Sequence, residues 1–375
     1  MSTIKTNAIL DASGGNTTTI NGATPTAYNT MGKNRIINGA MEIDQRNAGA
    51  SVTVPTGNDA YNIDRWNAQN DTDGTLTVQQ STTAPAGFRN SLVFTTGTAD
   101  TSLAAGQIAF CRHIIEGYNI ADLAWGTSDA KTITISFWVR SSLTGTFGGS
   151  LTNGDNNRSY PFSYTISSAN TWEQKTVTVA GDTTGTWGVG TGRGLSLWFG
   201  LGVGSTYSGT VGSWSGSSYF SATGATSVVG TNGATFYITG VQLEAGSVAT
   251  EFERRPYGTE LALCQRYYFV LAPKATLQPT GVASYYNNTY LATNVSFPTT
   301  MRSSPTVVSA SGTDYFIAYR AGSSDTFNSW TRDSGAVSQQ MVEIYNNTEI
   351  SGTGGQVATT RTNNASAFVH FNAEL

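Results

Sequence analysis

The stretch Ile133-Thr134-Ile135-Ser136-Phe137-Trp138-Val139 alternates large apolar residues with a second set made of Thr, Ser and Trp. An alternation with a period of two places one set on each face of a β-strand. Similar alternation recurs at residues 75–79, 176–179 and 236–239. Many short runs of this kind are typical of an antiparallel β-sandwich.

The composition and the turns also indicate an all-β protein. The chain of 375 residues contains 42 Gly, and only 12% of its residues are charged, where a typical soluble protein has about 25%. Thr, which favours strands, and Gly and Asn, which favour turns, take the place of the missing charges. Turn signals stand between the alternating runs at Asp73-Gly74, Asn153-Gly154-Asp155 and Asn232-Gly233.

Changes in composition divide the chain into four segments. Residues 1–32 hold too few large aliphatic side chains for a core, so we expect them to pack on another chain, as an attachment or trimer-entwining segment, with a flexible segment as the alternative. Residues 33–255 form the main sandwich. Residues 256–268 predict a short helix with Thr259 as its N-cap, and residues 269–375 predict a second β domain. The candidate strands of that domain are Tyr267–Leu271, Thr306–Ala310, Tyr315–Arg320, Met341–Tyr345 and Ala367–Phe371.

The segment from Gly202 to Gly233 is dominated by Gly, Ser and Thr, yet it carries Tyr207, Trp214 and Tyr219. Flexible linkers are rich in Gly and Ser, but they rarely carry three aromatic residues. We therefore expect an ordered excursion over the surface of the main domain.

Charge and targeting signals narrow the function classes. The net charge is −4 and there is no long basic run, which argues against a nucleic-acid partner, because phosphates require clustered Lys and Arg. Residues 1–7 lack the apolar run of a signal peptide, and no run approaches the roughly 18 apolar residues of a membrane span. Cys111 and Cys264 belong to no CxxC pair and are expected to be free thiols.

Three blocks of the sequence are similar to a known group of proteins. The first is NRIINGAMEIDQR (residues 34–46) with YNIDRW (61–66), the second is TFYITGVQLEAG (235–246) with ATEFERR (249–255), and the third is ELALCQRYY (260–268). Together, and in this order, they resemble bacteriophage tail-fibre and virion-fibre proteins whose central domain is a jelly roll similar to carbohydrate-binding modules. The resemblance covers roughly residues 33–270.

The resemblance implies a jelly-roll body at residues 33–255 with the second β domain as the fibre tip. It also implies a homotrimer, assembled in the host cytoplasm and located in the virion, which contacts other virion proteins through its N-terminal segment. Its function would be that of a tail-fibre, receptor-binding protein for host attachment through a surface glycan. A head fibre or capsid decoration protein with a structural role is the alternative. The family supplies no motif for ligand residues, so none is carried over.

Charged residues inside the blocks suggest local pairs. Asp64-Arg65-Trp66 is expected to be an ion pair beside a core aromatic residue. Glu244 follows the core residue Leu243 and is a candidate partner for Arg254 or Arg255.

A polysaccharide-degrading tailspike is a third, less favoured function. A glycosidase needs two carboxylates about 5–10 Å apart around the sugar, and no spacing in this chain places two of them on one face. The two histidines, His113 and His370, follow no GxSxG turn of a serine hydrolase. We therefore predict no catalytic residues and no enzymatic activity. The carboxylates considered were Asp64, Glu116, Glu173, Asp182, Asp314 and Asp325.

No cofactor is predicted. The run Asn70-Asp71-Thr72-Asp73-Gly74 is similar to the start of a calcium loop, but it lacks the terminal bidentate Glu of an EF-hand. Asp71 and Asp73 are thus weak candidate ligands of a structural calcium ion, and a polar turn is the alternative.

Aromatic residues of the second domain are the candidates for glycan binding, because an exposed ring can stack on the apolar face of a sugar. Neighbouring Asn, Asp and Arg side chains would bind its hydroxyl groups. Packing in the core or in the trimer is the alternative for each residue. The candidates are Tyr285, Tyr286, Tyr290, Tyr315, Tyr319 and Trp330.

Overall fold

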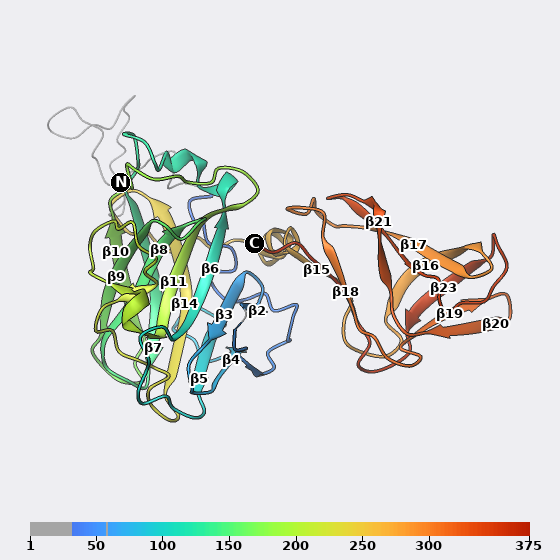
Figure 1. Ribbon diagram of the computed structural model, residues 1–375, viewed down its shortest axis with the longest axis horizontal. Coiled ribbons are helices and arrows are strands. Elements are labelled where there is room, and N and C mark those ends of the chain that lie inside the picture. Colours follow the sequence, from blue (N-terminus) through green and yellow to red (C-terminus); the bar gives the residue numbers. More distant parts are fainter. Residues whose placement is uncertain (1–31, 58) are drawn as a thin grey trace, which may run out of the picture. The chain divides into compact units, whose positions relative to one another are not determined.

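A computed structural model describes residues 32–57 and 59–375 of the protein (Figure 1). The predicted attachment segment, residues 1–32, lies outside the described residues apart from Gly32. Contacts between Cα atoms divide the chain into two units, Met1–Arg255 and Pro256–Leu375. The described residues confirm the predicted all-β class, with a jelly-roll β-sandwich body, a smaller C-terminal β domain and a short helix.

Two antiparallel six-stranded sheets make up the sandwich in the described part of the first unit. The β14 sheet has the order β1 (Val52–Thr53), β4 (Leu76–Ser81), β5 (Ser91–Thr96), β14 (Thr235–Ala245), β7 (Ile133–Ser141) and β10 (Glu173–Val179). The β11 sheet has the order β2 (Ala60–Ile63), β3 (Trp66–Asn70), β6 (Ile108–Glu116), β11 (Arg193–Val203), β8 (Gly145–Asn153) and β9 (Ser159–Ile166).

The core of the sandwich follows from the alternation of its strands. In β7, Ile133, Ile135 and Phe137 are fully buried and belong to one apolar cluster. Leu197 and Phe199 of β11 belong to the same cluster. Every second residue of each sheet therefore faces the other sheet, and burial of this apolar area is the main stabilising contribution.

The first two sequence blocks form one structural element. The backbone N–H of Arg35 donates to the Leu243 carbonyl at 2.9 Å, and the Val241 N–H donates to the Gly39 carbonyl at 2.9 Å. A Cβ atom at Gly39 would lie 2.2 Å from the Val241 oxygen, so only glycine permits this approach. The side chain of Asn34 also bonds β14, donating to the Val241 carbonyl at 3.2 Å.

The predicted partner of Glu244 was wrong. Its carboxylate accepts the N–H and the hydroxyl of Thr250, at 2.9 and 2.6 Å, and an N–H of Gln242 at 2.8 Å. Arg254 instead lies 4.6 Å over the ring of Phe88. Arg255 donates to the Ile36 carbonyl at 3.1 Å. Residues 249–251 turn back onto β14 and bring Thr250 to Glu244, an approach that sequence spacing does not reveal.

The Asp64-Arg65-Trp66 turn is buried, with Trp66 in the core as predicted. The Trp66 indole N–H donates to the Asn38 carbonyl at 3.0 Å. Asp64 accepts the backbone N–H and the side-chain amide of Gln45 at 2.8 and 2.6 Å. The turn therefore fixes residues 38–45 to the sandwich.

In the second unit, helix α1 (Tyr257–Gln265) begins earlier than expected, and Pro256 is its N-cap. The prediction of Thr259 as N-cap was wrong. The Pro256 carbonyl accepts the N–H groups of both Thr259 and Glu260, at 2.9 and 3.1 Å. Proline suits a helix start, because its missing N–H would have no partner there.

The strands of the second unit form two sheets in the described residues. Each strand predicted from the sequence is present, with bounds that differ by at most two residues. The three-stranded sheet has the order β15 (Tyr268–Ala272), β24 (Val369–Asn372) and β18 (Thr306–Ser309). The seven-stranded sheet has the order β20 (Ser323–Phe327), β19 (Phe316–Arg320), β23 (Val357–Thr362), β16 (Pro279–Asn287), β17 (Tyr290–Ser296), β22 (Met341–Asn346) and β21 (Thr331–Val337).

Alternation also divides the seven-stranded sheet into two faces. Its inner face carries the core of this unit, with Leu291, Phe316 and Ile344 fully buried. The opposite face, which we call the outer face, exposes Val282 and Tyr286 of β16. Across the described residues no helix combines the length and the apolar character needed to cross a membrane.

Candidate binding site

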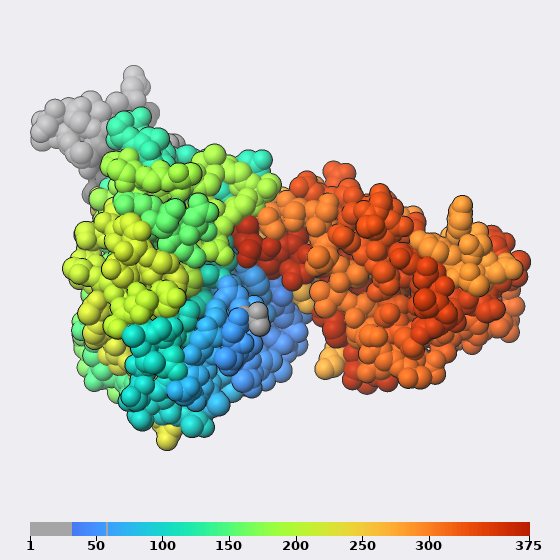
Figure 2. All heavy atoms as spheres, in the orientation of Figure 1, coloured from blue at the N-terminus to red at the C-terminus, as the bar shows by residue number. Residues whose placement is uncertain are grey.

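The face of the β11 sheet that points away from the β14 sheet is covered by the protein's own chain. The excursion of residues 204–223 contains the short helix η3 (Ser205–Tyr207) and the strands β12 (Ser208–Gly209) and β13 (Ser221–Ala222). Its Phe220 stacks on Trp198 of β11 with ring centroids 4.2 Å apart, and Tyr207 stacks on Phe220 at 5.2 Å. The guanidinium of Arg112 lies 4.4 Å from the Trp198 ring centre. Figure 2 shows this part of the chain in yellow-green as a continuous piece of the surface.

Glycines let the excursion lie directly on the sheet. A Cβ atom at Gly148 of β8 would be 2.3 Å from the Ser221 hydroxyl oxygen and 2.6 Å from the Ala222 nitrogen. A Cβ atom at Gly200 of β11 would be 2.6 Å from the same hydroxyl. This close fit occupies that face of the β11 sheet with the protein's own chain.

Three connections meet at one end of the seven-stranded sheet, which we call the loop end. They are the β16–β17 turn at residues 288–289, the β19–β20 turn at residues 321–322, and residues 347–356 between β22 and β23. Asn288 joins two of them, because its backbone carbonyl accepts the Gly352 N–H at 2.8 Å and its side-chain oxygen accepts the Gly354 N–H at 3.2 Å.

A charged cluster links the remaining connection, the β19–β20 turn, to residues 347–356. Arg320 donates to Asp325 at 2.5 Å, to the Tyr285 hydroxyl at 3.2 Å and to the Ser351 carbonyl at 2.5 Å. The Tyr285 hydroxyl in turn donates to Asp325 at 3.0 Å. Burial, together with the Asp325 carboxylate, raises the pKa of Tyr285 to about 12. Tyr285 therefore stays protonated and acts as a structural donor.

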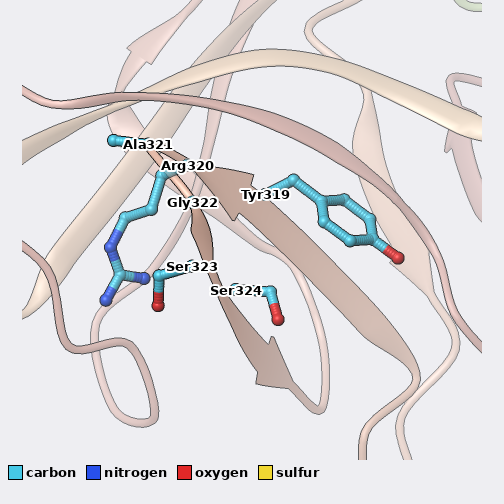
Figure 3. A pocket seen from close by; sticks show the side chains of 6 residues that line it. All are labelled: Tyr319, Arg320, Ala321, Gly322, Ser323 and Ser324. Atoms are coloured by element: carbon cyan, nitrogen blue, oxygen red, sulfur yellow. The ribbon is translucent and has the colours of Figure 1, made fainter.

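The β19–β20 hairpin borders a hollow of about 420 Å³. Figure 3 shows Tyr319 and Ser324 on one side of the hairpin and Arg320 on the other. This division follows from strand geometry, because Tyr319 and Ser324 are paired across the hairpin. Arg361 of β23 lies 4.6 Å over the Tyr319 ring. The hollow is lined by Tyr319, Arg320, Ala321, Gly322, Ser323 and Ser324.

Three tyrosines gather on the outer face near the loop end, and we call them the tyrosine cluster: Tyr286, Tyr290 and Tyr345. Tyr290 and Tyr345 stack with ring centroids 4.9 Å apart and planes 13° apart. Tyr286 meets Tyr290 edge to face at 6.0 Å, and 83% of its surface is exposed. The Tyr290 hydroxyl donates to Glu343 at 3.1 Å.

Burial raises the pKa of Tyr290, and the hydrogen bond and charge of Glu343 raise it further. Its ring is therefore a neutral platform held in a fixed orientation. Tyr286, by contrast, makes only the ring contact with Tyr290 among the described residues. An exposed aromatic residue next to oriented ones can stack on a ligand.

The predicted ligand residues are thus placed in different environments. Tyr286, Tyr290 and Tyr319 lie on the outer face, where Tyr319 is 40% exposed. Tyr285 faces inward and is 1% exposed, and Trp330 is buried against Phe327 with ring centroids 4.9 Å apart. Tyr315 is partly buried against the same core.

Tyr345 is the member of the cluster that sequence reasoning missed. In β22 it alternates with buried residues, so that Met341, Glu343 and Tyr345 share the outer face. The pairing of Tyr345 with Ala292 of β17 brings it next to Tyr290. The alternation of residues 341–345 indicates that Met341, Glu343 and Tyr345 lie on one face of a strand. That Tyr290 is the neighbour of Tyr345, however, depends on the order of the strands in the sheet.

The other chemistry considered from the sequence is explained by local contacts. Asp71 accepts the Gly57 N–H at 2.5 Å, and Asp73 is exposed at the turn. Asp182 accepts two N–H groups of Arg158 at 2.7 and 2.8 Å. Within residues 32–57 and 59–375, no group of three His, Cys, Asp or Glu side chains is arranged to hold a metal ion.

Comparison with known proteins gives similarity only among solved structures. No protein-family model matches this chain, and no curated protein matches it. The enzymatically active domain of tailspike protein 4 from bacteriophage CBA120 is similar over 57% of this chain, with 13% identity and a TM-score of 0.30. That match spans 21% of the tailspike chain.

Carbohydrate-binding modules are similar as well. A family 11 module from Clostridium thermocellum, described in complex with a mixed-linked β-1,3-1,4 tetrasaccharide, matches 54% of this chain and 99% of its own, with 10% identity and a TM-score of 0.29. A structure described as CBM4 matches 56% of this chain and 98% of its own, with 16% identity and a TM-score of 0.28. With TM-scores of 0.28 to 0.30, these similarities assign neither a function nor a ligand to this chain.

Proposed function

We propose that this protein is a non-enzymatic fibre subunit of a bacteriophage particle that binds a host-surface glycan through the tyrosine cluster. The observation that supports glycan binding most directly is Tyr286, which is 83% exposed beside the stacked pair of Tyr290 and Tyr345. A single exposed apolar residue needs no explanation, but neighbouring aromatic rings that form one patch are a candidate ligand surface.

The chemistry of the outer face suits a sugar. A tyrosine ring offers an apolar face for the C–H groups of a pyranose, and its hydroxyl stays available to water or ligand. Ser284 and Asn294 are exposed on the same face of β16 and β17. Their hydroxyl and amide groups can both donate to and accept from sugar hydroxyls.

The fibre assignment rests on the three sequence blocks. Two of them assemble around Asn34 and Val241, so the resemblance covers residues that act together in the sandwich rather than scattered positions. In this proposal the chain forms a homotrimer in the virion. Residues 1–32 attach it to another virion protein, and the C-terminal unit contacts the host.

Binding of the full-length, fluorescently labelled protein to host cells tests glycan recognition, with and without periodate oxidation of surface sugars. We expect binding that periodate abolishes, and a loss of about tenfold in affinity for Tyr286→Ala, since stacking on one aromatic ring contributes on the order of 1–1.5 kcal/mol. Tyr118→Ala is the matched control, because Tyr118 is 62% exposed in the first unit. Equal binding by all variants, or binding that periodate leaves unchanged, contradicts the proposal.

The assembly is tested separately. Light scattering at micromolar concentration should give the mass of a trimer, and a monomeric mass contradicts that part of the proposal. Immunogold labelling of intact particles distinguishes a tail fibre from a head fibre, because it reports where the chain is attached.

A further inference from the structure

Two carboxylates border the tyrosine cluster. Glu343 of β22 accepts the Tyr290 hydroxyl at 3.1 Å. Asp333 of β21 shares a strand face with Thr331, which pairs with Tyr345 of the cluster. Burial raises the pKa of Tyr290, and the charges of Glu343 and Asp333 raise it further. Both side chains are partly exposed, so the cluster combines aromatic faces with negative charge at the solvent boundary.

Neither carboxylate is neutralised by a basic residue of the described chain. The partner of Glu343 is the Tyr290 hydroxyl. Asp333 accepts the backbone N–H groups of Gly335 and Ala336, at 2.6 and 3.1 Å. Asp325 of the same unit, by contrast, forms an ion pair with Arg320, with 2.5 Å between the carboxylate oxygen and the guanidinium nitrogen.

The arginines of the seven-stranded sheet are engaged away from the cluster. Arg320 is bound by Asp325 and the Ser351 carbonyl. Arg361 of β23 lies over the ring of Tyr319. In the sheet, β16 and β17 stand between β23 and β22, the strand that carries Glu343. Arg332 of β21 donates to the Pro305 carbonyl at 2.8 Å. The charged groups that the described residues place beside the tyrosine cluster are therefore the carboxylates of Glu343 and Asp333.

Resting on the proposed glycan binding, we infer that the glycan bound by the tyrosine cluster carries a positively charged amino group, as in a hexosamine without its N-acetyl group. An ammonium group is attracted by the face of a tyrosine ring and by a carboxylate at the same time. An acidic glycan is repelled by Glu343 and Asp333, and a neutral glycan covers the carboxylates without offering them a charged partner.

The test uses polysaccharide extracted from the host envelope. One half is selectively N-acetylated with acetic anhydride in aqueous bicarbonate, which removes the charge of amino groups but leaves the sugar hydroxyls, and the other half is mock-treated. Binding of the full-length protein is measured on both by biolayer interferometry. We expect binding to fall about tenfold or more on the N-acetylated glycan.

Variants then connect the effect to the site. Glu343→Gln keeps an oxygen that can accept the Tyr290 hydroxyl but removes the charge, so we expect weaker binding to the mock-treated glycan and little further loss on N-acetylation. Asp129→Asn, an exposed carboxylate of the first unit, is the matched control and should behave as the parent protein. Higher salt should weaken binding of the parent more than that of Glu343→Gln.

The outcomes separate this inference from the proposed function. Equal binding to both glycan samples, with Tyr286→Ala still defective, overturns the amino-group inference and leaves glycan binding intact. Absence of binding to either sample overturns the proposed function and the inference with it. The inference is also overturned if N-acetylation weakens binding of Glu343→Gln as much as it weakens binding of the parent protein. Another part of the protein would then recognise the amino group.

Discussion

Phe220 lies on Trp198 with ring centroids 4.2 Å apart and planes 21° apart, so an aromatic residue of the excursion fills the outer face of the protein's own β-sandwich. Phe220 is 7% exposed and Trp198 is 2% exposed. Together with Phe110 they form an apolar cluster separate from the main core. The first unit thus has apolar packing on both sides of the β11 sheet.

Removing this stack should destabilise the first unit. We expect Phe220→Ala to lower the free energy of unfolding by about 3 kcal/mol, because a buried aromatic side chain is lost and a cavity remains. Urea unfolding followed by tryptophan fluorescence measures the change, and Trp198 should emit at longer wavelength in the folded variant. Val211→Ala is the control, since Val211 lies in the same excursion and is 46% exposed. Equal stability of the two variants contradicts a packing role for Phe220.

The close approach of the excursion makes a second prediction. Gly148→Ala places a methyl group 2.3 Å from the Ser221 hydroxyl oxygen and 2.6 Å from a backbone nitrogen. We expect a loss of about 2 kcal/mol in thermal or urea unfolding, because the backbone must shift to relieve the overlap. Gly216→Ala has no neighbour within 4 Å of its Cβ position and should stay within about 0.5 kcal/mol of the parent. A Gly148→Ala protein as stable as Gly216→Ala would show that the excursion does not rest on β8.

The buried histidine of the first unit predicts a pH dependence. Burial lowers the pKa of His113 well below its usual value, and the charge of Arg65 lowers it further. The unfolded chain binds a proton below about pH 6.5 and the folded chain does not, so stability falls as the pH falls. Between pH 7 and pH 5 the loss should be about 2 kcal/mol.

Urea titrations at several pH values measure this slope for the first unit. His113→Gln removes the titrating group but retains His370, so its stability should change less with pH, although it is lower throughout. An identical slope in the parent and in His113→Gln assigns the pH dependence to other groups.

The Arg320 cluster should control the order of the loop end. We expect Arg320→Ala to release the Ser351 carbonyl and to loosen Asp325, which accepts the Ser351 N–H at 3.2 Å. The second unit should lose about 1–2 kcal/mol, and the Ser351 amide should exchange its hydrogen faster. Arg361→Ala serves as the control because Arg361 lies on the outer face over Tyr319. If the Ser351 amide exchanges its hydrogen at the same rate in Arg320→Ala as in the parent, the Arg320 cluster does not hold the loop end.

Much of the fold could be predicted because strand alternation is a local property. The runs at residues 133–139 and 236–239 contain their own face assignment, and β7 and β14 appear where they predict strands. Helix α1 was predicted as an element, but its N-cap is Pro256, three residues before the predicted Thr259, and the Pro256 carbonyl accepts the first N–H groups of the helix. The error is confined to the first turn, because either N-cap leaves the rest of the helix at the same residues.

The site was less predictable, because it depends on which strands become neighbours. Tyr345 is 55 residues from Tyr290 in the sequence, as their numbers show, and only the pairing of β17 with β22 brings the two rings together. A neighbour this far along the chain leaves no trace in a single sequence. Glu244 shows a local limit instead, because its partner Thr250 is six residues ahead and is brought back to it by the bends at residues 246–248.

Tyr285 and Tyr286 mark the boundary between the two sources of information. The sequence by itself determined that the protein is all-β, but it assigned neither residue to a strand and made both of them candidates for glycan binding. The structure places both in β16, and adjacent residues of a strand face opposite sides of its sheet because a strand has a period of two. Only the tertiary structure decided that Tyr285 points to the core and Tyr286 to solvent. That choice depends on which face of the seven-stranded sheet the rest of the unit covers, and burial of the larger apolar set on that face settles it.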